Sequence, residues 1–378
     1  MPTLDIAMPL ALLLIVTAAV FLNKRTEKKI QDTIEKSELQ TKDTIPFVAM
    51  AIVAVSTFTV SSFLYSGRLF ENALLSFFLG AYTMMLFTVT HIFSDIKTRR
   101  VQLFSAGFGI GSLIVGVVSI LEPFRDAATV FRAGAFFGLS ILCFVIALYA
   151  QKQKNEKKAK WYLAIQPPAL FFLFYVFFNL YFEGAINAQL PGVYTLWFPG
   201  LLNIFGATFA IMIILYLSPM FNWKTVGIFA FILTLIDIIL VFSGPMGAAA
   251  ETFTGLGLPV LIYLPNVPLI PSVAGGFLLR GLGLGDFFFA GVLAIQIFHQ
   301  FGKKYAYTSV ASMVLSFGIW EAYLPTITAF FGINGFPATV CIITGWIPIV
   351  VIGLLLHKKP KGNPPLTIHQ TEYVDAPP

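Results

Sequence analysis

The sequence predicts an all-α polytopic membrane protein, and three observations support this fold class. Hydrophobic residues make up 57% of the 378 positions and charged residues only 11%, whereas soluble domains average about 25% charged residues. Apolar stretches of about 20 residues recur along the chain, which is long enough to cross a bilayer core of about 30 Å as helices. These stretches are continuous rather than alternating, which excludes a transmembrane β-barrel.

The composition also excludes several other classes of protein. A disordered chain would combine low hydrophobicity with high charge. Two cysteines cannot build a disulfide framework, and four scattered histidines argue against a metal cage. The net charge is +6, but the longest polar loop has only about twenty residues. We therefore expect no nucleic-acid-binding domain.

About eleven apolar stretches are expected to span the membrane as helices. They lie near residues 3–22, 45–65, 73–94, 103–121, 128–150, 161–182, 200–219, 225–243, 276–301, 305–325 and 335–357. The chain is expected to have three parts. About seven spans occupy residues 1–224, a C-terminal membrane core occupies residues 225–357, and a disordered Pro-rich tail follows at residues 358–378.

The distribution of Lys and Arg predicts that the N-terminus lies outside and the C-terminus inside. Six basic segments fall on one side of the predicted spans and hold 20 of the 24 basic residues. Positively charged loops stay cytoplasmic. The first apolar stretch has Asp5 and no basic residue before it, and a basic cluster follows it. This arrangement predicts a retained anchor rather than a cleaved signal peptide.

Two acidic residues lie deep inside apolar segments. Asp237 follows Lys224 by 13 residues, which places it roughly 20 Å from the inner face at 1.5 Å per residue. Asp286 follows Gly276 by ten residues, which places it roughly 15 Å from the outer face. In a core of about 30 Å, these two estimates place both carboxyl groups at similar depth. The two predicted helices are consecutive and antiparallel, so the carboxyl groups can meet.

A carboxylate in hydrocarbon costs several kcal/mol, so an acid at this depth indicates a function. Two carboxyl groups in one dry site do not both ionise easily, and one can keep a proton while the other acts as a base. Two alternatives stay open at this point. Each acid can be protonated and structural, or the pair can couple protons or sodium ions in a secondary transporter.

The remaining charged residues are expected near water. Sixteen acids, Asp5 and Glu321 among them, lie in predicted loops, in tails or near span ends. Arg280 lies about one turn from Asp286 and is expected to extend to the outer interface. Cys143 and Cys341 lie in predicted spans and are interpreted as small packing residues.

Glycines 281, 283 and 285 alternate in the segment that leads to Asp286. They indicate either close helix packing or room for the backbone of a substrate. Leu258–Pro265 is rich in β-branched and aromatic residues and contains two prolines. This segment predicts either a strand edge for an extended peptide or a buried loop.

Gly283-Leu284-Gly285-Asp286 resembles the Gly-x-Gly-Asp motif of the presenilin and signal-peptide-peptidase family of intramembrane aspartyl proteases. That family has a second Asp in the preceding span, usually after Tyr, and here Ile236 precedes Asp237. Its Pro-Ala-Leu motif opens the last span, where this chain has Pro337-Ala338-Thr339. Pro167-Pro168-Ala169-Leu170 matches more closely but precedes both aspartates, so it is interpreted as a coincidence.

The resemblance covers about residues 225–350 and implies an intramembrane aspartyl endopeptidase that cuts transmembrane or signal-peptide-like substrates in the lipid bilayer. It implies no metal, no organic cofactor and no required partner subunit. The outside N-terminus is similar to signal peptide peptidase rather than presenilin. The implied catalytic pair is Asp237 and Asp286, and the implied motif and substrate-binding residues are Gly283, Leu284, Gly285, Pro337, Ala338 and Thr339.

Several alternatives and one further departure, in the number of spans, accompany this resemblance. The family usually has nine spans, and about eleven are expected here. A secondary transporter is the alternative function, and prepilin-peptidase-like proteases also have a Gly-x-Gly-Asp motif, on fewer spans. A non-catalytic relative that serves as a scaffold is a third possibility. In a prokaryote, the expected location is the plasma membrane.

Overall fold

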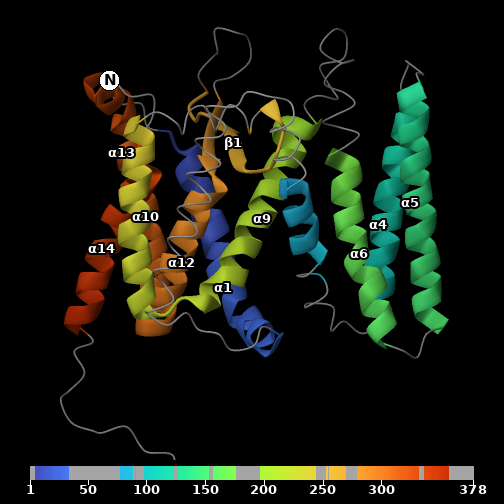
Figure 1. Ribbon diagram of the computed structural model, residues 1–378, viewed down its shortest axis with the longest axis horizontal. Coiled ribbons are helices and arrows are strands. Elements are labelled where there is room, and N and C mark those ends of the chain that lie inside the picture. Colours follow the sequence, from blue (N-terminus) through green and yellow to red (C-terminus); the bar gives the residue numbers. More distant parts are fainter. Residues whose placement is uncertain are drawn as a thin grey trace, which may run out of the picture.

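The computed structural model describes residues 5–33, 77–87, 90, 98–121, 127–152, 156–175, 196–243, 253, 255–269, 279–331 and 336–356. Within these ranges the chain is predominantly helical, as the sequence predicts, and it also contains one two-stranded sheet (Figure 1). The expected span near 45–65 and the expected disordered tail at 358–378 lie outside the described residues.

The helices and strands follow one another in the order that Figure 1 shows. The α-helices are α1 (Ala7–Thr33), α4 (Thr98–Leu121), α5 (Ala127–Lys152), α6 (Glu156–Tyr175), α9 (Leu202–Leu217), α10 (Trp223–Ser243), α12 (Leu284–Phe301), α13 (Lys303–Phe331) and α14 (Ala338–Leu356). A π-helical turn (Leu196–Leu201) precedes α9, and a 3-10 turn (Ser218–Met220) follows it. The strands are β1 (Leu261–Pro265) and β2 (Leu279–Gly283).

Five helices are long and apolar enough to cross a membrane, and they make this an integral membrane protein. They cover Pro199–Met220, Trp223–Phe242, Leu284–Phe301, Lys303–Phe330 and Ala338–Leu356. Five shorter apolar helices occur among the described residues, at Ala7–Asn23, Phe77–Phe87, Ser105–Ile120, Ala133–Leu148 and Ala164–Tyr175. Each of these ten helices lies within or overlaps a predicted span.

Helix α12 forms the centre of the larger helix group and packs against α1, α9, α10, α13 and α14 (Figure 1). Its side chains from Phe289 to Ile297 are all buried, as expected for a helix that is apolar on every face. Helices α4, α5 and α6 pack together in a second group. Outward-facing apolar side chains on α4 and α5, such as Leu103, Ile114 and Ile141, stay exposed as lipid contacts require.

Aromatic side chains connect the two helix groups. Tyr82, from the 77–87 helix, stacks on Phe209 of α9 with ring centroids 4.1 Å apart. Phe171 of α6 contacts the ring of Phe209 edge to face, at 5.3 Å. Such pairs contribute about 0.5–1.5 kcal/mol beyond the burial of their surface. The cluster therefore holds α6 against α9 and, through α9, against the central helices.

The predicted span at 276–301 is wrong at its outer end, because the helix begins only at Leu284. The preceding residues form β2, which pairs antiparallel with β1 in a register that places Gly281 opposite Tyr263. A Cβ atom at Gly281 would lie 3.0 Å from the Tyr263 ring. Gly281 and Gly283 therefore belong to a strand in close contact with its partner, where glycine is tolerated better than in a helix interior.

Replacing Gly345 with Ala is expected to lower the free energy of unfolding by about 1–3 kcal/mol through overpacking. A Cβ atom there would lie 2.5 Å from the backbone oxygen of Ser312 and 2.7 Å from the Cα of Met313, so α13 and α14 would have to separate. Gly227→Ala on α10 is the matched control, because no atom lies within 4 Å of the added Cβ. It should stabilise the helix by up to about 1 kcal/mol. Thermal unfolding in detergent measures both, and equal stabilities would contradict this packing.

Candidate active site

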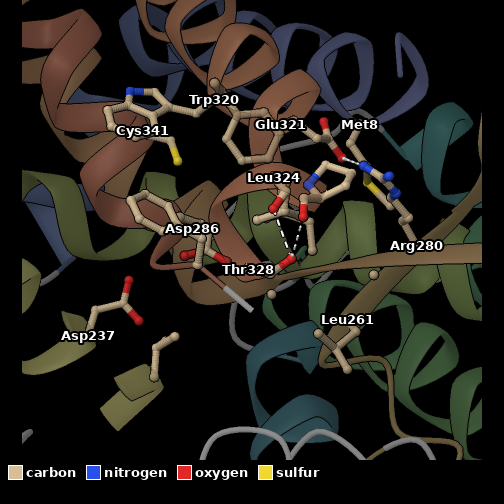
Figure 2. A pocket seen from close by; sticks show the side chains of 18 residues that line it. Met8, Asp237, Leu261, Arg280, Asp286, Trp320, Glu321, Leu324, Thr328 and Cys341 are labelled. Atoms are coloured by element: carbon tan, nitrogen blue, oxygen red, sulfur yellow. Dashed lines mark hydrogen bonds and ion pairs between the residues drawn. The ribbon is translucent and has the colours of Figure 1, made fainter. Parts of the chain in front are cut away.

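One pocket of about 540 Å³ lies among α10, β2, α12, α13 and the start of α14. Its wall is mostly apolar, with Met8, Phe317, Trp320, Leu324 and Phe336 among the lining side chains. Its charged lining residues are Asp237, Asp286, Arg280 and Glu321. Figure 2 shows the two aspartates on one side of this space and the Arg280–Glu321 pair on the other.

Asp286 lies in the first turn of α12, where the chain passes from strand to helix. The amino-terminal end of a helix carries unpaired N–H groups and a partial positive charge, which favour a carboxylate. Gly283 is the N-cap residue in an extended conformation, and a Cβ atom there would lie 3.2 Å from Oδ2 of Asp286. The glycine at this position therefore leaves room for the carboxyl group beside the backbone.

Asp237 lies on α10, and the first turn of α14 holds its carboxyl group. The hydroxyl group of Thr339 donates a hydrogen bond of 2.6 Å to Oδ2 of Asp237, and the Thr339 N–H donates to the same oxygen at 3.3 Å. This N–H is free to do so because the first N–H groups of a helix have no partner within it. The threonine that replaces the leucine of the Pro-Ala-Leu motif thus supplies a side-chain hydrogen bond that leucine cannot make.

The two carboxyl groups come together as the depth estimate predicts. Asp237 and Asp286 line the same pocket, lie close enough for their charges to interact, and extend into the same space in Figure 2. The estimate itself relied on a helix from Gly276, whereas α12 starts at Leu284. The two carboxyl groups share the pocket although the chain before Leu284 is a strand rather than a helix.

The other predicted site residues take three different positions. Gly283 and Ala338 line the pocket beside the aspartates. Leu284 is buried in the hydrophobic core, and its N–H donates to the Val260 oxygen at 3.0 Å. Gly285, Pro337 and Thr339 are not among the lining residues, and of these Thr339 touches the site through Asp237. The Pro167–Leu170 segment lies inside α6 and is not part of the pocket.

The predicted strand edge in Leu258–Pro265 is already occupied at its centre. Asn203 of α9 donates from its amide nitrogen to the Tyr263 oxygen at 2.5 Å, and the Tyr263 N–H donates to Oδ1 of Asn203 at 2.7 Å. In an antiparallel pair, two opposite residues either bond to each other through their backbone groups or both direct these groups away from each other. Gly281 lies opposite Tyr263, whose backbone groups bond to Asn203 instead. The N–H and C=O of Gly281 therefore point away from β1. Among the described residues, the open edge of the hairpin is therefore that of β2, which lines the pocket at Arg280–Gly283.

Asp5 and Glu321, which the sequence placed near water, are buried, and Arg280 is partly buried beside Glu321. Arg280 and Glu321 form an ion pair of 3.0 Å between Nη1 and Oε1, with 20% and 8% of their side chains exposed. Asp5 is only 2% exposed, and its Oδ1 accepts hydrogen bonds from the N–H groups of Ala7 and Val267. The expectation that both acids are solvated is wrong, and the Arg280 side chain is paired with Glu321. No local pattern reveals this cluster, because its members lie on three separate segments.

Comparisons with known proteins give this site no precedent. The chain matches no protein-family model, no curated protein and no solved structure. The interpretation of the pocket consequently rests on its own geometry and on the motif resemblance. That geometry offers two carboxyl groups on a common space, a donor pair on one of them and an open strand edge beside the other.

Proposed function

We propose that this protein is an intramembrane aspartyl endopeptidase that hydrolyses peptide bonds of transmembrane or signal-peptide-like substrates. The observation that carries the proposal is that Asp237 and Asp286, on neighbouring helices, line one pocket. A pair of carboxyl groups that share a site can hold one proton between them, which supplies an acid and a base at the same pH. The proposed chemistry requires no metal and no organic cofactor.

In the proposed reaction, the ionised carboxyl group takes a proton from a water molecule. The water oxygen attacks the carbonyl carbon of the peptide bond, and the protonated carboxyl group donates its proton to the developing oxyanion. The tetrahedral intermediate then collapses: one of its hydroxyl groups returns a proton to the carboxylate that had acted as acid, the C–N bond breaks, and the leaving nitrogen receives a proton from the carboxyl group that acted as base. The pair returns to its starting state, with one proton shared between Asp237 and Asp286.

A substrate helix hides its own peptide bonds, so the cleaved segment must first become extended. The open edge of β2 supports this step, because Gly281 points its backbone N–H and C=O away from β1. Pairing with an exposed strand edge is a recurrent way to bind an extended peptide. Asp286 follows β2 by three residues, so a peptide on this edge would bring a peptide bond toward the two carboxyl groups.

The proposed topology has about eleven spans, an outside N-terminus and a cytoplasmic C-terminus. The uneven distribution of Lys and Arg supports this orientation, with 20 of 24 basic residues on one side. The motif resemblance supports a protease that acts without partner subunits. The proposed location is a cell membrane in which single-span peptides or signal-peptide remnants accumulate, the plasma membrane in a prokaryote.

Cleavage by the purified protein tests the proposal. The protein in detergent is incubated with a signal-peptide-like substrate, and mass spectrometry identifies the products. We expect cuts inside the apolar segment, and we expect a peptide with a hydroxyl-bearing, tetrahedral replacement of the cut bond to inhibit, because such an analogue resembles the transition state. Absence of cleavage in an otherwise folded preparation, with a range of apolar single-span peptides, would contradict the protease.

A secondary transporter is the second candidate, because carboxyl groups deep in a membrane also bind coupling ions. The observation in its favour is that Asp237 and Asp286 line an open pocket rather than a sealed core. The same preparation, reconstituted in liposomes, distinguishes the two. Proton-driven or sodium-driven uptake that depends on both aspartates, without peptide cleavage, would favour the transporter.

A further inference from the structure

The pocket has a second charged end that the proposed catalysis does not use. In Figure 2, Arg280 and Glu321 lie on the side of the pocket opposite to Asp237. Both residues line the pocket, and Asp5 lies close enough to Glu321 for the two carboxylates to repel each other. The Arg280–Glu321 ion pair therefore has a second carboxylate near it, and the three groups carry an excess of one negative charge when all are ionised.

Two carboxylate oxygens of this cluster are buried and have no partner within the part of the chain that the structure describes. Oε2 of Glu321 and Oδ2 of Asp5 make no hydrogen bond to any described residue. Glu321 is 8% exposed and Asp5 is 2% exposed, so water does not replace the missing partners freely. Buried polar atoms of native proteins are nearly always hydrogen-bonded, and an unpaired buried charge is strongly unfavourable. Glu321 lines the pocket and Asp5 does not, so an additional cationic group at this end of the pocket would satisfy the free oxygen of Glu321 and offset the negative charge of Asp5 beside it.

We propose that Glu321, with the added negative charge of the buried Asp5 near it, forms an anionic subsite that binds a basic side chain of the peptide substrate. The proposal rests on the protease function proposed above, because it places a substrate in the same pocket. An ammonium group offers three donors and no acceptor, which suits a free carboxylate oxygen of Glu321 in a cluster with an excess of negative charge. A hard inorganic cation would instead need about six oxygen ligands. The apolar wall at Met8 and Leu324 suits the methylene stem of a lysine.

The position of the basic residue relative to the cut follows from the strand. Arg280 precedes Gly283 by three residues on β2, which corresponds to about 10 Å of extended chain. Gly283 lies beside the Asp286 carboxyl group. A peptide that pairs with the open edge of β2 would therefore place a side chain near Glu321 when it lies about two to four residues from the cut bond.

Binding of a peptide series tests this subsite independently of catalysis. Otherwise identical apolar single-span peptides carry one Lys, norleucine or Glu at successive positions, and their binding to the Asp286→Asn protein in detergent is measured by fluorescence anisotropy. At one position we expect Lys to bind about tenfold more tightly than norleucine, since charge-assisted hydrogen bonds are strong, and Glu to bind most weakly. Equal affinities for Lys and norleucine at every position, or no peptide binding, would overturn the subsite.

Variants of the cluster give opposite expectations. Glu321→Gln and Asp5→Asn should each reduce the ratio of Lys to norleucine affinity several-fold, whereas Arg280→Gln should increase it, because the competing cation is removed. If these residues had only a structural role, all three variants would change the ratio of Lys to norleucine affinity in the same direction. Lys304→Gln removes an exposed charge on α13 and is the control, with no expected change. If Glu321→Gln does not fold, Asp5→Asn, which leaves the Arg280–Glu321 pair in place, decides the question.

Two further measurements separate lysine binding at this subsite from sodium binding and from peptide cleavage. Replacing sodium chloride with choline chloride should leave the preference for Lys over norleucine unchanged. A preference for Lys that appears only in choline chloride would identify sodium as the occupant and overturn the proposal. Cleavage of the same series by the wild-type protein distinguishes the two proposals. Cleavage without Lys preference would overturn the subsite alone, while Lys preference in binding without cleavage would overturn the protease and leave the subsite standing.

Discussion

Replacing Asp237 or Asp286 with Asn is expected to reduce peptide cleavage by at least about a thousandfold, because each change removes one half of the acid–base pair. Asn has the shape of Asp but neither accepts nor releases a proton in this range. Both carboxyl groups line the same pocket, so each single variant should lose the same step. Rates are measured with a fluorogenic single-span peptide, and products are identified by mass spectrometry.

The double variant makes this test stricter. Groups that act as a unit are not additive, so Asp237→Asn with Asp286→Asn should be no slower than either single variant. Stability is the control, because two carboxyl groups in one dry site repel when both are charged. The single variants should therefore unfold at the wild-type temperature or above it. Substantial cleavage by the double variant would show that another group performs the chemistry.

The sequence predicted the parts of this fold that depend on composition along the chain. Long apolar helices follow from the need to satisfy every backbone group inside lipid, and Asp237 and Asp286 stood out because few acids lie so deep in apolar segments. The start of α12 could not be predicted in this way. Leu279–Gly283 lies in one long stretch of low charge with the helix that follows, and its two glycines did not by themselves predict a strand. Its pairing with Leu261–Pro265 shows that it is one.

The charged end of the pocket could not be predicted from the sequence for a different reason. Arg280, Glu321 and Asp5 each looked like an interfacial residue when considered alone, since each lies near the end of an apolar stretch. Their burial depends on contacts between segments that are 41 residues apart for Arg280 and Glu321 and 262 residues apart for Asp5 and Val267. The spacing of apolar residues along one helix contains no information about contacts between segments that are so far apart in the sequence.

Thr339 shows how a departure from a motif can carry information. The sequence presents it only as a mismatch to the leucine of Pro-Ala-Leu. In the structure it is 4% exposed and gives Asp237 two hydrogen bonds on one oxygen. Burial of a hydroxyl group is favourable only when it finds a partner, so threonine fits here because a carboxyl group is within reach. We infer that Thr339 positions Asp237 for the proposed reaction.

Thr339→Val is expected to lower kcat by about 10- to 100-fold with little change in KM, because hydrogen bonds to charged groups contribute about 1.5–3 kcal/mol. Valine keeps the shape of threonine but removes the hydroxyl that donates to Oδ2 of Asp237 at 2.6 Å. The backbone hydrogen bond at 3.3 Å remains, so activity should fall without disappearing. Initial rates over a range of peptide concentrations separate kcat from KM.

Three companion variants decide whether this loss comes from the hydroxyl group. Thr339→Ser keeps the donor and should restore most of the rate. Thr339→Leu restores the residue of the family motif but removes the donor from a site that is 4% exposed, so it should lose at least as much activity as Thr339→Val. Thr308→Val makes the same chemical change at an exposed hydroxyl on α13, bonded to the Lys304 oxygen, and should be silent. If Thr339→Val and Thr339→Leu retain the wild-type rate, the hydrogen bond does not position Asp237, and the threonine serves only to pack the start of α14 against α10.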